Sequence, residues 1–180
     1  MSKEFSTWAR NETSPATEWT RALARSEHER AGGPGVGVVG MCLTGNFALA
    51  MMVDPVVVAP VLSQPSLPFT LSGGHRRDLN VSAEDLAAVK QRCETEADLC
   101  VLGLRFSGDR LSPGDRFERL REELGDSFVG VEIDSSKDNP HGIGRLAHSV
   151  LTEDFVDEPG HPTMDALGQV IDLFQRRLAA

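Results

Sequence analysis

Residues 36–52 read Val-Gly-Val-Val-Gly-Met-Cys-Leu-Thr-Gly-Asn-Phe-Ala-Leu-Ala-Met-Met. The first part is apolar and rich in valine and glycine, which predicts a short strand over Val36–Met41. The second part is rich in alanine, leucine and methionine, which favours a helix over Leu43–Met52. Cys42 stands at the junction. A strand that turns directly into a helix around a nucleophilic side chain is typical of a nucleophile elbow, G-x-nucleophile-x-G.

The small residues around Cys42 have a physical reason. In such an elbow the backbone of the nucleophile is strained, and bulky side chains two residues before it, or two to three after it, would collide with the turning chain. Gly40 and Gly45 meet this need, whereas Thr44 occupies the second position after Cys42. The N-terminus of the helix would lower the pKa of the thiol and favour the thiolate. The alternative interpretation is that Cys42 is a small buried hydrophobe in an ordinary turn.

The composition bounds the class of protein. The chain has 180 residues, 40% hydrophobic and 25% charged, as in a soluble globular protein, and a single domain over residues 1–180 is expected. The net charge of −9, without a basic run, argues against nucleic acid and anionic membranes as partners. Residues 1–10 lack the apolar core of a signal peptide, and no apolar stretch reaches membrane-spanning length. Three cysteines without paired spacing indicate a reducing, cytoplasmic location.

Neither a metal nor another cofactor is expected. The His, Cys and carboxylate residues show no spacing typical of a metal site. The glycine-rich segment 32–37 precedes a strand, whereas a phosphate-binding loop would follow one. The remaining chemistry is therefore that of side chains alone.

Apolar runs alternate with helical patterns along the rest of the chain. Further strands are predicted over residues 56–62, 99–106 and 128–133, and further helices over 15–31, 82–97, 116–124 and 164–178. In the first helix, Trp19 and Leu23 are expected to form the apolar stripe, with Arg21 facing water. Residues 63–77 read as a loop long enough to carry function. This order predicts an α/β fold, a three-layer parallel sheet with helices on both faces.

Three candidate functional residues follow predicted strands. Cys42 ends the first strand, Asp109 follows the third and His148 follows the fourth. In open parallel sheets, active residues gather at the carboxyl ends of strands, and the order nucleophile, acid, histidine is that of the α/β-hydrolases. In that chemistry the imidazole removes the proton of the nucleophile and later protonates the leaving group, while the carboxylate orients the imidazole.

Other residues compete for two of these roles. Asp115 is a second candidate for the acid, although both aspartates could serve turns or helix starts, and Asp109 is preferred because it lies nearer the strand end. His141 and His161 lie in the same irregular region as His148. His148 is preferred because the Ser-Val-Leu after it could anchor the side chain by packing.

Three segments in this order resemble the dienelactone hydrolase family. Residues 40–45, Gly-Met-Cys-Leu-Thr-Gly, are similar to that family's cysteine elbow, G-x-C-x-G-G, with Thr44 in place of the first glycine after the elbow. Residues 107–113, Ser-Gly-Asp-Arg-Leu-Ser-Pro, resemble its acid loop, and residues 147–149 resemble its histidine loop. The similarity extends from about Glu18 to the C-terminus, which is most of the chain.

The resemblance implies the C-terminal portion of an α/β-hydrolase fold and a catalytic triad of Cys42, His148 and Asp109 acting on a small ester or lactone. The backbone N–H of Leu43 would be one donor to the oxyanion. Candidates for the substrate pocket are residues 63–69 and Arg145.

A full member of that family has several strands before the nucleophile strand, whereas only 35 residues precede Val36 here. The sequence is therefore interpreted as an N-terminally shortened member. Its first strand would present an unpaired apolar edge, and self-association through this edge is expected. Two competing hypotheses are a non-catalytic or incomplete hydrolase fold that acts as a binding module, and a redox-sensing thiol at Cys42.

Overall fold

The computed structural model describes residues 12–67 and 73–179. At its centre is a parallel sheet of four strands in the order β1-β2-β3-β4. The strands are β1 (Val36–Met41), β2 (Val57–Ser63), β3 (Val101–Phe106) and β4 (Phe128–Ile133). All four predicted strands are present, and β1 and β4 have the predicted bounds. Because the strands are parallel, their carboxyl ends meet at one edge of the sheet.

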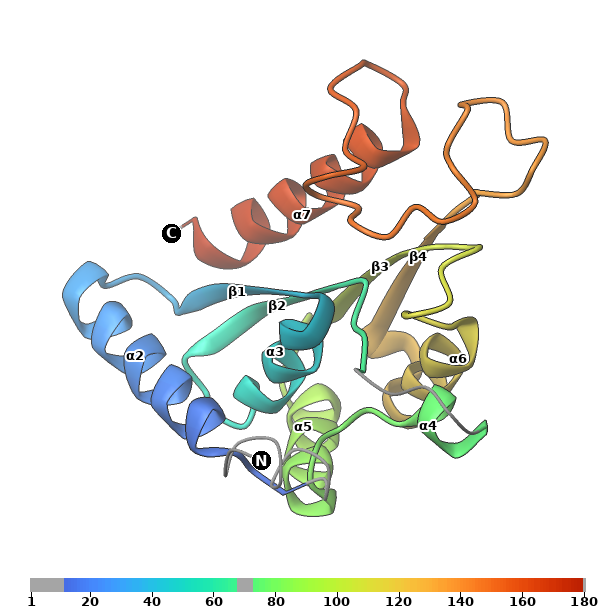
Figure 1. Cartoon of the computed structure of the whole chain (residues 1–180). Coiled ribbons are helices and arrows are strands. Elements are labelled where there is room, and N and C mark those ends of the chain that lie inside the picture. The colour runs from blue at the N-terminus through green and yellow to red at the C-terminus, as the bar shows by residue number, and fades with distance from the viewer. Residues whose placement is uncertain (1–11, 68–72, 180) are drawn as a thin grey trace.

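Helices cover both faces of the sheet (Figure 1). One face carries α2 (Pro15–Ala31), α3 (Gly45–Met51), α5 (Ala83–Thr95) and α6 (Gly114–Leu124), with the short α4 (Gly73–Arg77) beside α6. The other face carries α7 (Pro162–Leu178). Short 3₁₀ turns, Cys42–Thr44 and Gly125–Ser127, precede α3 and β4. The predicted three-layer α/β architecture is confirmed.

Each face of the sheet has its own apolar core. On the side of α3, α5 and α6, the core includes Leu49, Val89 and Phe117. On the side of α7 it includes Leu104 and residues of α7 itself. β2 and β3 are buried along their whole length, which explains their continuous apolar sequences. Full burial of one such side chain contributes about 1.5–3 kcal/mol, so these two strands hold the carboxyl edge of the sheet firmly in place.

The orientation of α2 differs from the prediction, which was wrong on this point. Trp19 and Leu23 are 66% and 43% exposed, whereas Arg21 is 6% exposed. The guanidinium of Arg21 donates two hydrogen bonds, of 3.1 and 2.6 Å, to the carbonyl of Ala50 and lies 3.0 Å from the carboxylate of Asp85. A buried charge is tolerated where it is paired and hydrogen-bonded. The helix therefore turns its arginine inward, and its predicted stripe faces solvent.

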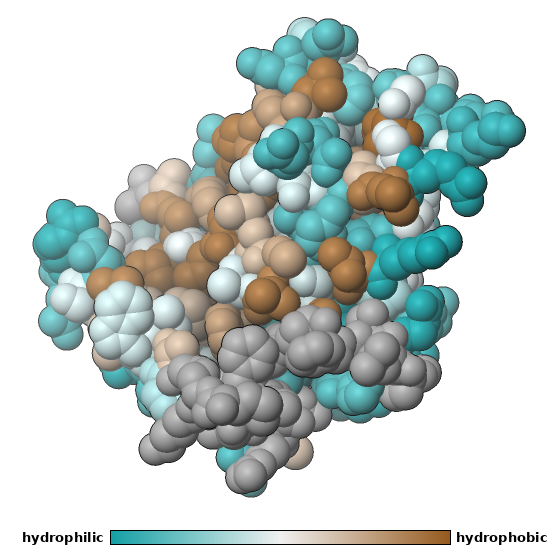
Figure 2. Space-filling model, in the orientation of Figure 1, coloured by the Kyte–Doolittle hydropathy of each residue, from teal (hydrophilic) through white to brown (hydrophobic). Residues whose placement is uncertain are grey.

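The two outer strands of the sheet, β1 and β4, differ in charge. Within the described residues, β1 has β2 as its only strand neighbour, and Val39 and Met41 are 41% and 37% exposed. Apolar surface extends across this side of the molecule (Figure 2). The β4 edge carries Glu132, which pairs with Arg105 of β3. Charges protect edge strands from pairing with other chains, so β4 has a protection that β1 lacks.

The segment predicted as a long loop, residues 63–77, contains the one short helix α4, and residues 68–72 of it lie outside the described part of the chain. No helix in the described ranges combines the length and apolarity needed to cross a membrane.

Candidate active site

Cys42 occupies a strained turn between β1 and α3. Its φ of 53° lies in the left-handed region that residues other than glycine rarely adopt. A single 3₁₀ turn, Cys42–Thr44, joins the strand to the helix. This backbone is the one expected of a nucleophile elbow, and it holds the partly exposed thiol at the carboxyl end of β1.

Close contacts explain the small residues of the elbow. A Cβ atom at Gly40 would lie 2.3 Å from the carbonyl oxygen of Thr44, and one at Gly45 would lie 2.6 Å from the Cα of Pro65. Thr44, which departs from the family pattern, closes the turn. Its hydroxyl donates to the carbonyl of Met41 (2.8 Å) and accepts from the backbone N–H of Met41 (3.0 Å). The threonine therefore stabilises the elbow instead of crowding it.

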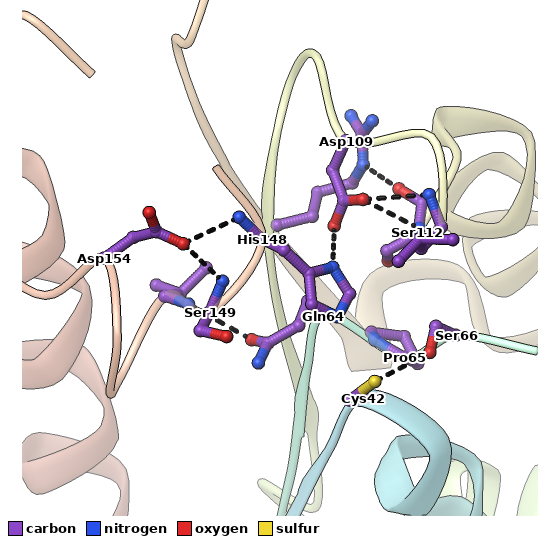
Figure 3. Close-up of polar contacts among 12 residues, drawn as sticks. Cys42, Gln64, Pro65, Ser66, Asp109, Ser112, His148, Ser149 and Asp154 are labelled. Carbon is purple, nitrogen blue, oxygen red and sulfur yellow. Dashed lines mark hydrogen bonds and ion pairs between the residues drawn. The ribbon is translucent and has the colours of Figure 1, made fainter. Parts of the chain in front are cut away.

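His148 and Asp109 meet at the same edge of the sheet. Nδ1 of His148 lies 2.7 Å from Oδ2 of Asp109 (Figure 3). The other carboxylate oxygen, Oδ1, accepts the backbone N–H groups of Leu111 (2.9 Å) and Ser112 (3.2 Å). Asp109 is 5% exposed. These bonds fix the carboxylate in one orientation, directed at the imidazole.

The imidazole of His148 lies between Asp109 and the sulfur of Cys42 (Figure 3). Its Nε2 atom is buried and has no hydrogen-bond partner among the described residues. The hydrogen bond to Asp109 is the main cause that raises the pKa of His148 to about 9, with a further contribution from Cys42. Burial alone would raise the pKa of the Cys42 thiol, but contacts with Ser66 and His148 outweigh burial and lower it. The raised pKa of His148 and the lowered pKa of Cys42 both favour an imidazolium beside a thiolate.

The alternative residues make structural contacts elsewhere. Asp115 lies in the first turn of α6 with its side chain 40% exposed, and one of its carboxylate oxygens is 2.7 Å from Nε of Arg76. His161 is the N-cap of α7. His141 is exposed and lies edge-on against His161, with ring centroids 5.4 Å apart. These three side chains serve surface or helix-capping contacts.

Two residues that hold the histidine loop were not singled out from the sequence. Oδ2 of Asp154 accepts the backbone N–H groups of His148 (2.8 Å) and Ser149 (2.9 Å). Oε1 of Gln64, a residue that is 1% exposed, accepts the N–H of Val150 (3.3 Å). An aspartate several residues after a histidine is no recognisable signal. Gln64, however, lies within the segment that the sequence predicted to border the pocket.

The other candidate pocket residues are placed as follows. Ser66 lies beside the thiol, with Oγ 3.1 Å from Sγ of Cys42. Residues 68 and 69 lie outside the described part of the chain. Arg145 is exposed on the loop that leads to His148. Among the described residues of the candidate segment, Ser66 is therefore the one whose side chain is within hydrogen-bond distance of the sulfur.

The backbone N–H of Leu43 is the donor nearest the elbow in sequence. It is one of the groups that lower the pKa of the Cys42 thiol. It also lies where the 3₁₀ turn leads into α3, and helix starts carry unpaired donors and partial positive charge. Across residues 12–67 and 73–179, no group of three or more His, Cys, Asp or Glu side chains could hold a metal ion.

A cavity of about 900 Å³ lies far from this chemistry, at the opposite end of the strands. It is lined by the end of α5 and the residues between α5 and β3, by the start of β4 with the 3₁₀ turn before it, and by the C-terminal part of α7, and Cys93 and Cys100 are among its lining residues. Burial raises the pKa of both thiols. This cavity therefore lacks an activated nucleophile, and Cys42 remains the one thiol among the three with a lowered pKa.

Three solved structures of hydrolases share this fold. The chain aligns over 87% of its length with 74% of a monoacylglycerol lipase from Paleococcus ferrophilus, with a TM-score of 0.52 and 14% identity. It aligns over 89% of its length with 70% of MGS-MChE2, an α/β-hydrolase enzyme from a metagenome of lagoon sediments at Mar Chica, Morocco (TM-score 0.51, 17% identity). It also aligns over 89% of its length with 60% of a protein assigned as a dienelactone hydrolase from Klebsiella pneumoniae (TM-score 0.52, 17% identity).

At these identities the likeness shows the fold, so the chain has an α/β-hydrolase fold with a four-stranded parallel sheet. No family model matches the sequence, and no curated protein matches it.

Proposed function

We propose that this protein hydrolyses a small ester or lactone, with Cys42 as nucleophile, His148 as general base and acid, and Asp109 as the group that orients the imidazole. The observation that carries the proposal is the position of His148. Its Nδ1 is bonded to Asp109 at 2.7 Å, while its Nε2 has no partner among the described residues and lies on the side of Cys42. That arrangement suits proton transfer between the thiol and the leaving group.

In the first half of the reaction, the Cys42 thiolate attacks the carbonyl carbon of the ester. The electron pair of the C=O bond moves to oxygen, and the N–H of Leu43 donates a hydrogen bond to this oxyanion. The intermediate then collapses and breaks the bond to the alkoxide. The alkoxide takes the proton from Nε2 of His148, and the acyl group remains on sulfur as a thioester. With a lactone, the same step opens the ring.

In the second half, water attacks the thioester. His148, now neutral, takes a proton from the water through Nε2 as the new carbon–oxygen bond forms. Collapse of this second intermediate expels the Cys42 thiolate and releases the acid, which loses its proton to solvent. The lowered pKa of Cys42 favours this step, because a more acidic thiol is a better leaving group.

The surroundings of the thiol support an uncharged substrate. Met41 and Leu43, the neighbours of Cys42 in sequence, are 37% and 43% exposed and offer apolar surface beside it. The net charge of −9 disfavours anionic substrates. Two of the compared proteins are, by name, a lipase of monoacylglycerol and a dienelactone hydrolase, which supports an ester or a lactone as the scissile group.

The test is hydrolysis of a small uncharged aryl ester, such as p-nitrophenyl acetate, by the wild type and two matched variants. Cys42→Ser should lower turnover by about 10³-fold or more, because a hydroxyl is not ionised beside His148 as the thiol is and is a far weaker nucleophile in this position. Cys93→Ser, which changes a half-buried thiol far from the elbow, should leave turnover unchanged. Equal turnover by the wild type and Cys42→Ser would contradict the proposal.

Alkylation provides a test that needs no substrate. Iodoacetamide at neutral pH should label Cys42 faster than Cys93 or Cys100, whose pKa values are raised by burial. Mass spectrometry of the labelled peptides measures the three rates. Equal rates would reject an activated thiol. Selective labelling of a cooperatively folded chain that cleaves no ester would favour the non-catalytic binding role instead.

A further inference from the structure

Ser66 is attached to the nucleophile by two hydrogen bonds. Its backbone N–H donates to the carbonyl of Cys42 (2.9 Å), and its Oγ lies 3.1 Å from Sγ (Figure 3). The side chain is almost fully buried, at 2% exposure, so water does not compete for its hydroxyl. Ser66 is therefore bonded to Cys42 through both its backbone and its side chain.

The position of Ser66 is itself fixed by its surroundings. The preceding residue, Pro65, packs so tightly against Gly45 of α3 that a Cβ at Gly45 would lie 2.6 Å from its Cα. The carbonyl of Pro65 accepts a hydrogen bond of 2.7 Å from Arg116, a side chain with no exposed surface. The N–H of Gln64 donates to the carbonyl of Leu104 in β3 (2.7 Å). The hydroxyl is thus preorganised beside the thiol by the sheet, by α3 and by α6.

We propose that Ser66 is a positioning residue of the active site, whose hydroxyl donates a hydrogen bond to the Cys42 thiolate and holds the sulfur where His148 can reach it. The inference rests on the function proposed above. A thiolate has no proton to give, so in the ionised state the hydroxyl must be the donor. The donor comes from the loop after β2, whereas His148 comes from the loop after β4, so the sulfur is held from two separate elements.

The proposal has a chemical consequence that a purely structural role would not have. A donor to the thiolate stabilises the charged form, and its loss raises the pKa of the thiol. The same donor also reduces the intrinsic nucleophilicity of the thiolate, since nucleophilicity falls with pKa with a Brønsted slope of about 0.4–0.5. Removing the hydroxyl should therefore slow alkylation at low pH and accelerate it at high pH. The other groups that face the sulfur are His148, with Asp109 behind it, and the N–H of Leu43.

The experiment measures the rate of Cys42 alkylation by iodoacetamide against pH, with peptide mass spectrometry on the full chain. For Ser66→Ala, a pKa raised by about one unit predicts a rate roughly threefold lower than wild type well below the pKa and roughly threefold higher on the alkaline plateau. The two curves should cross. Ser66→Thr, which keeps the hydroxyl, should restore a curve close to that of the wild type.

The matched control is Ser82→Ala. Its hydroxyl is also buried and hydrogen-bonded, to the backbone N–H of Asp85 (3.0 Å), but it caps α5 and takes no part in the site, so its loss should leave the alkylation curve of Cys42 unchanged. A Ser66→Ala curve that overlays the wild type, or one lowered at every pH, would overturn the positioning role while Cys42 remained the selective nucleophile. Failure of Cys42 to react faster than Cys93 and Cys100 in the wild type would instead overturn the proposed function. Circular dichroism of Ser66→Ala shows whether it folds. If it does not, Ser66→Val, which has the shape of Ser66→Thr without the hydroxyl, is the substitute variant.

Discussion

Asp109 holds His148 through a hydrogen bond of 2.7 Å between Oδ2 and Nδ1, from a carboxylate that is 5% exposed. The two residues are on separate loops, one after β3 and one after β4, and the bond joins them at the carboxyl edge of the sheet. The remaining oxygen of Asp109 is occupied by two backbone N–H groups. The carboxylate therefore acts on the imidazole from a fixed position and controls both its orientation and its charge.

Replacing this carboxylate should impair hydrolysis far more than replacing its competitor. We expect Asp109→Asn to lower kcat by about 10²–10⁴-fold, because the neutral amide no longer stabilises the imidazolium. Asp115→Asn removes only an exposed ion pair with Arg76, of the kind that contributes about 0–1 kcal/mol, and should leave kcat unchanged. Ester hydrolysis under saturating substrate measures both. Similar losses in the two variants would contradict the assignment of Asp109.

The charge of His148 should make stability depend on pH with a definite sign. Its pKa is raised from 6.5 to about 9, mainly by Asp109, so the folded state holds a proton that the unfolded state releases earlier. The resulting stabilisation is fully present below about pH 6.5 and is lost as the pH rises through about 9. The difference in free energy of unfolding between Cys42→Ala and Cys42→Ala/His148→Gln isolates this effect from titration of the thiol. A difference that grows with pH would contradict the raised pKa.

The parts of the site that follow local rules could be predicted from the sequence. The elbow was found because a tight turn excludes side chains at fixed offsets from the nucleophile, and the contacts of Gly40 and Gly45 show that exclusion directly. Cys42, Asp109 and His148 were identified as candidates because the carboxyl ends of parallel strands share one edge. Both rules need only the chain order and the type of each element.

The parts that could not be predicted depend on contacts between distant segments. Arg21 was expected to face water, but it satisfies the carbonyl of Ala50, which is 29 residues away. Ser66 and Arg116 have no pattern of their own, since a serine in a loop and an arginine on a charged helix are ordinary. Their roles arise only when the carbonyls of other loops are brought to them by the completed sheet.

Gly40, two residues before the nucleophile, should not tolerate even one additional methyl group. In Gly40→Ala, the new Cβ would lie 2.3 Å from the carbonyl of Thr44, so the turn must shift at a cost of about 1–3 kcal/mol in the free energy of unfolding. Gly168→Ala is the matched control, because this glycine of α7 has open space around its Cβ position and alanine is favoured in helices by about 0.5–1 kcal/mol. Urea denaturation should show a lower free energy of unfolding for Gly40→Ala and a higher one for Gly168→Ala. Equal stability of the two variants would contradict the tight elbow.

We propose that the edge of β1 pairs with the same edge of a second copy of the chain. β1 has neither charge nor proline along its length, so a twofold antiparallel pair would bring no like charges together. Val39→Lys should favour the monomer in sedimentation velocity over a range of protein concentrations. Val129→Lys, at a position of matching exposure on the β4 edge, should not. A wild type that stays monomeric at high concentration would reject this pairing.

Arg116 should be the most costly arginine to replace. It is completely buried, and its guanidinium donates to four backbone carbonyls, at 2.7 to 3.2 Å, which belong to Pro65, His75, Asp78 and Leu111. Burial lowers the pKa of Arg116 to about 10, which still leaves it charged at neutral pH. Arg116→Met should lower the free energy of unfolding by about 2–5 kcal/mol, because it leaves buried carbonyls without donors.

Arg116→Met should also affect the reactivity of Cys42, because Arg116 binds the carbonyl of Pro65 and Pro65 precedes Ser66. Once Pro65 is released, Ser66 is held less firmly, and the alkylation curve of Cys42 should move toward that of Ser66→Ala. Arg76→Met, which removes a surface ion pair, is the control and should change neither stability nor the curve by much. An Arg116→Met protein as stable as Arg76→Met would contradict the structural role. A destabilised protein with an unchanged alkylation curve would show that the loop holds Ser66 without Arg116.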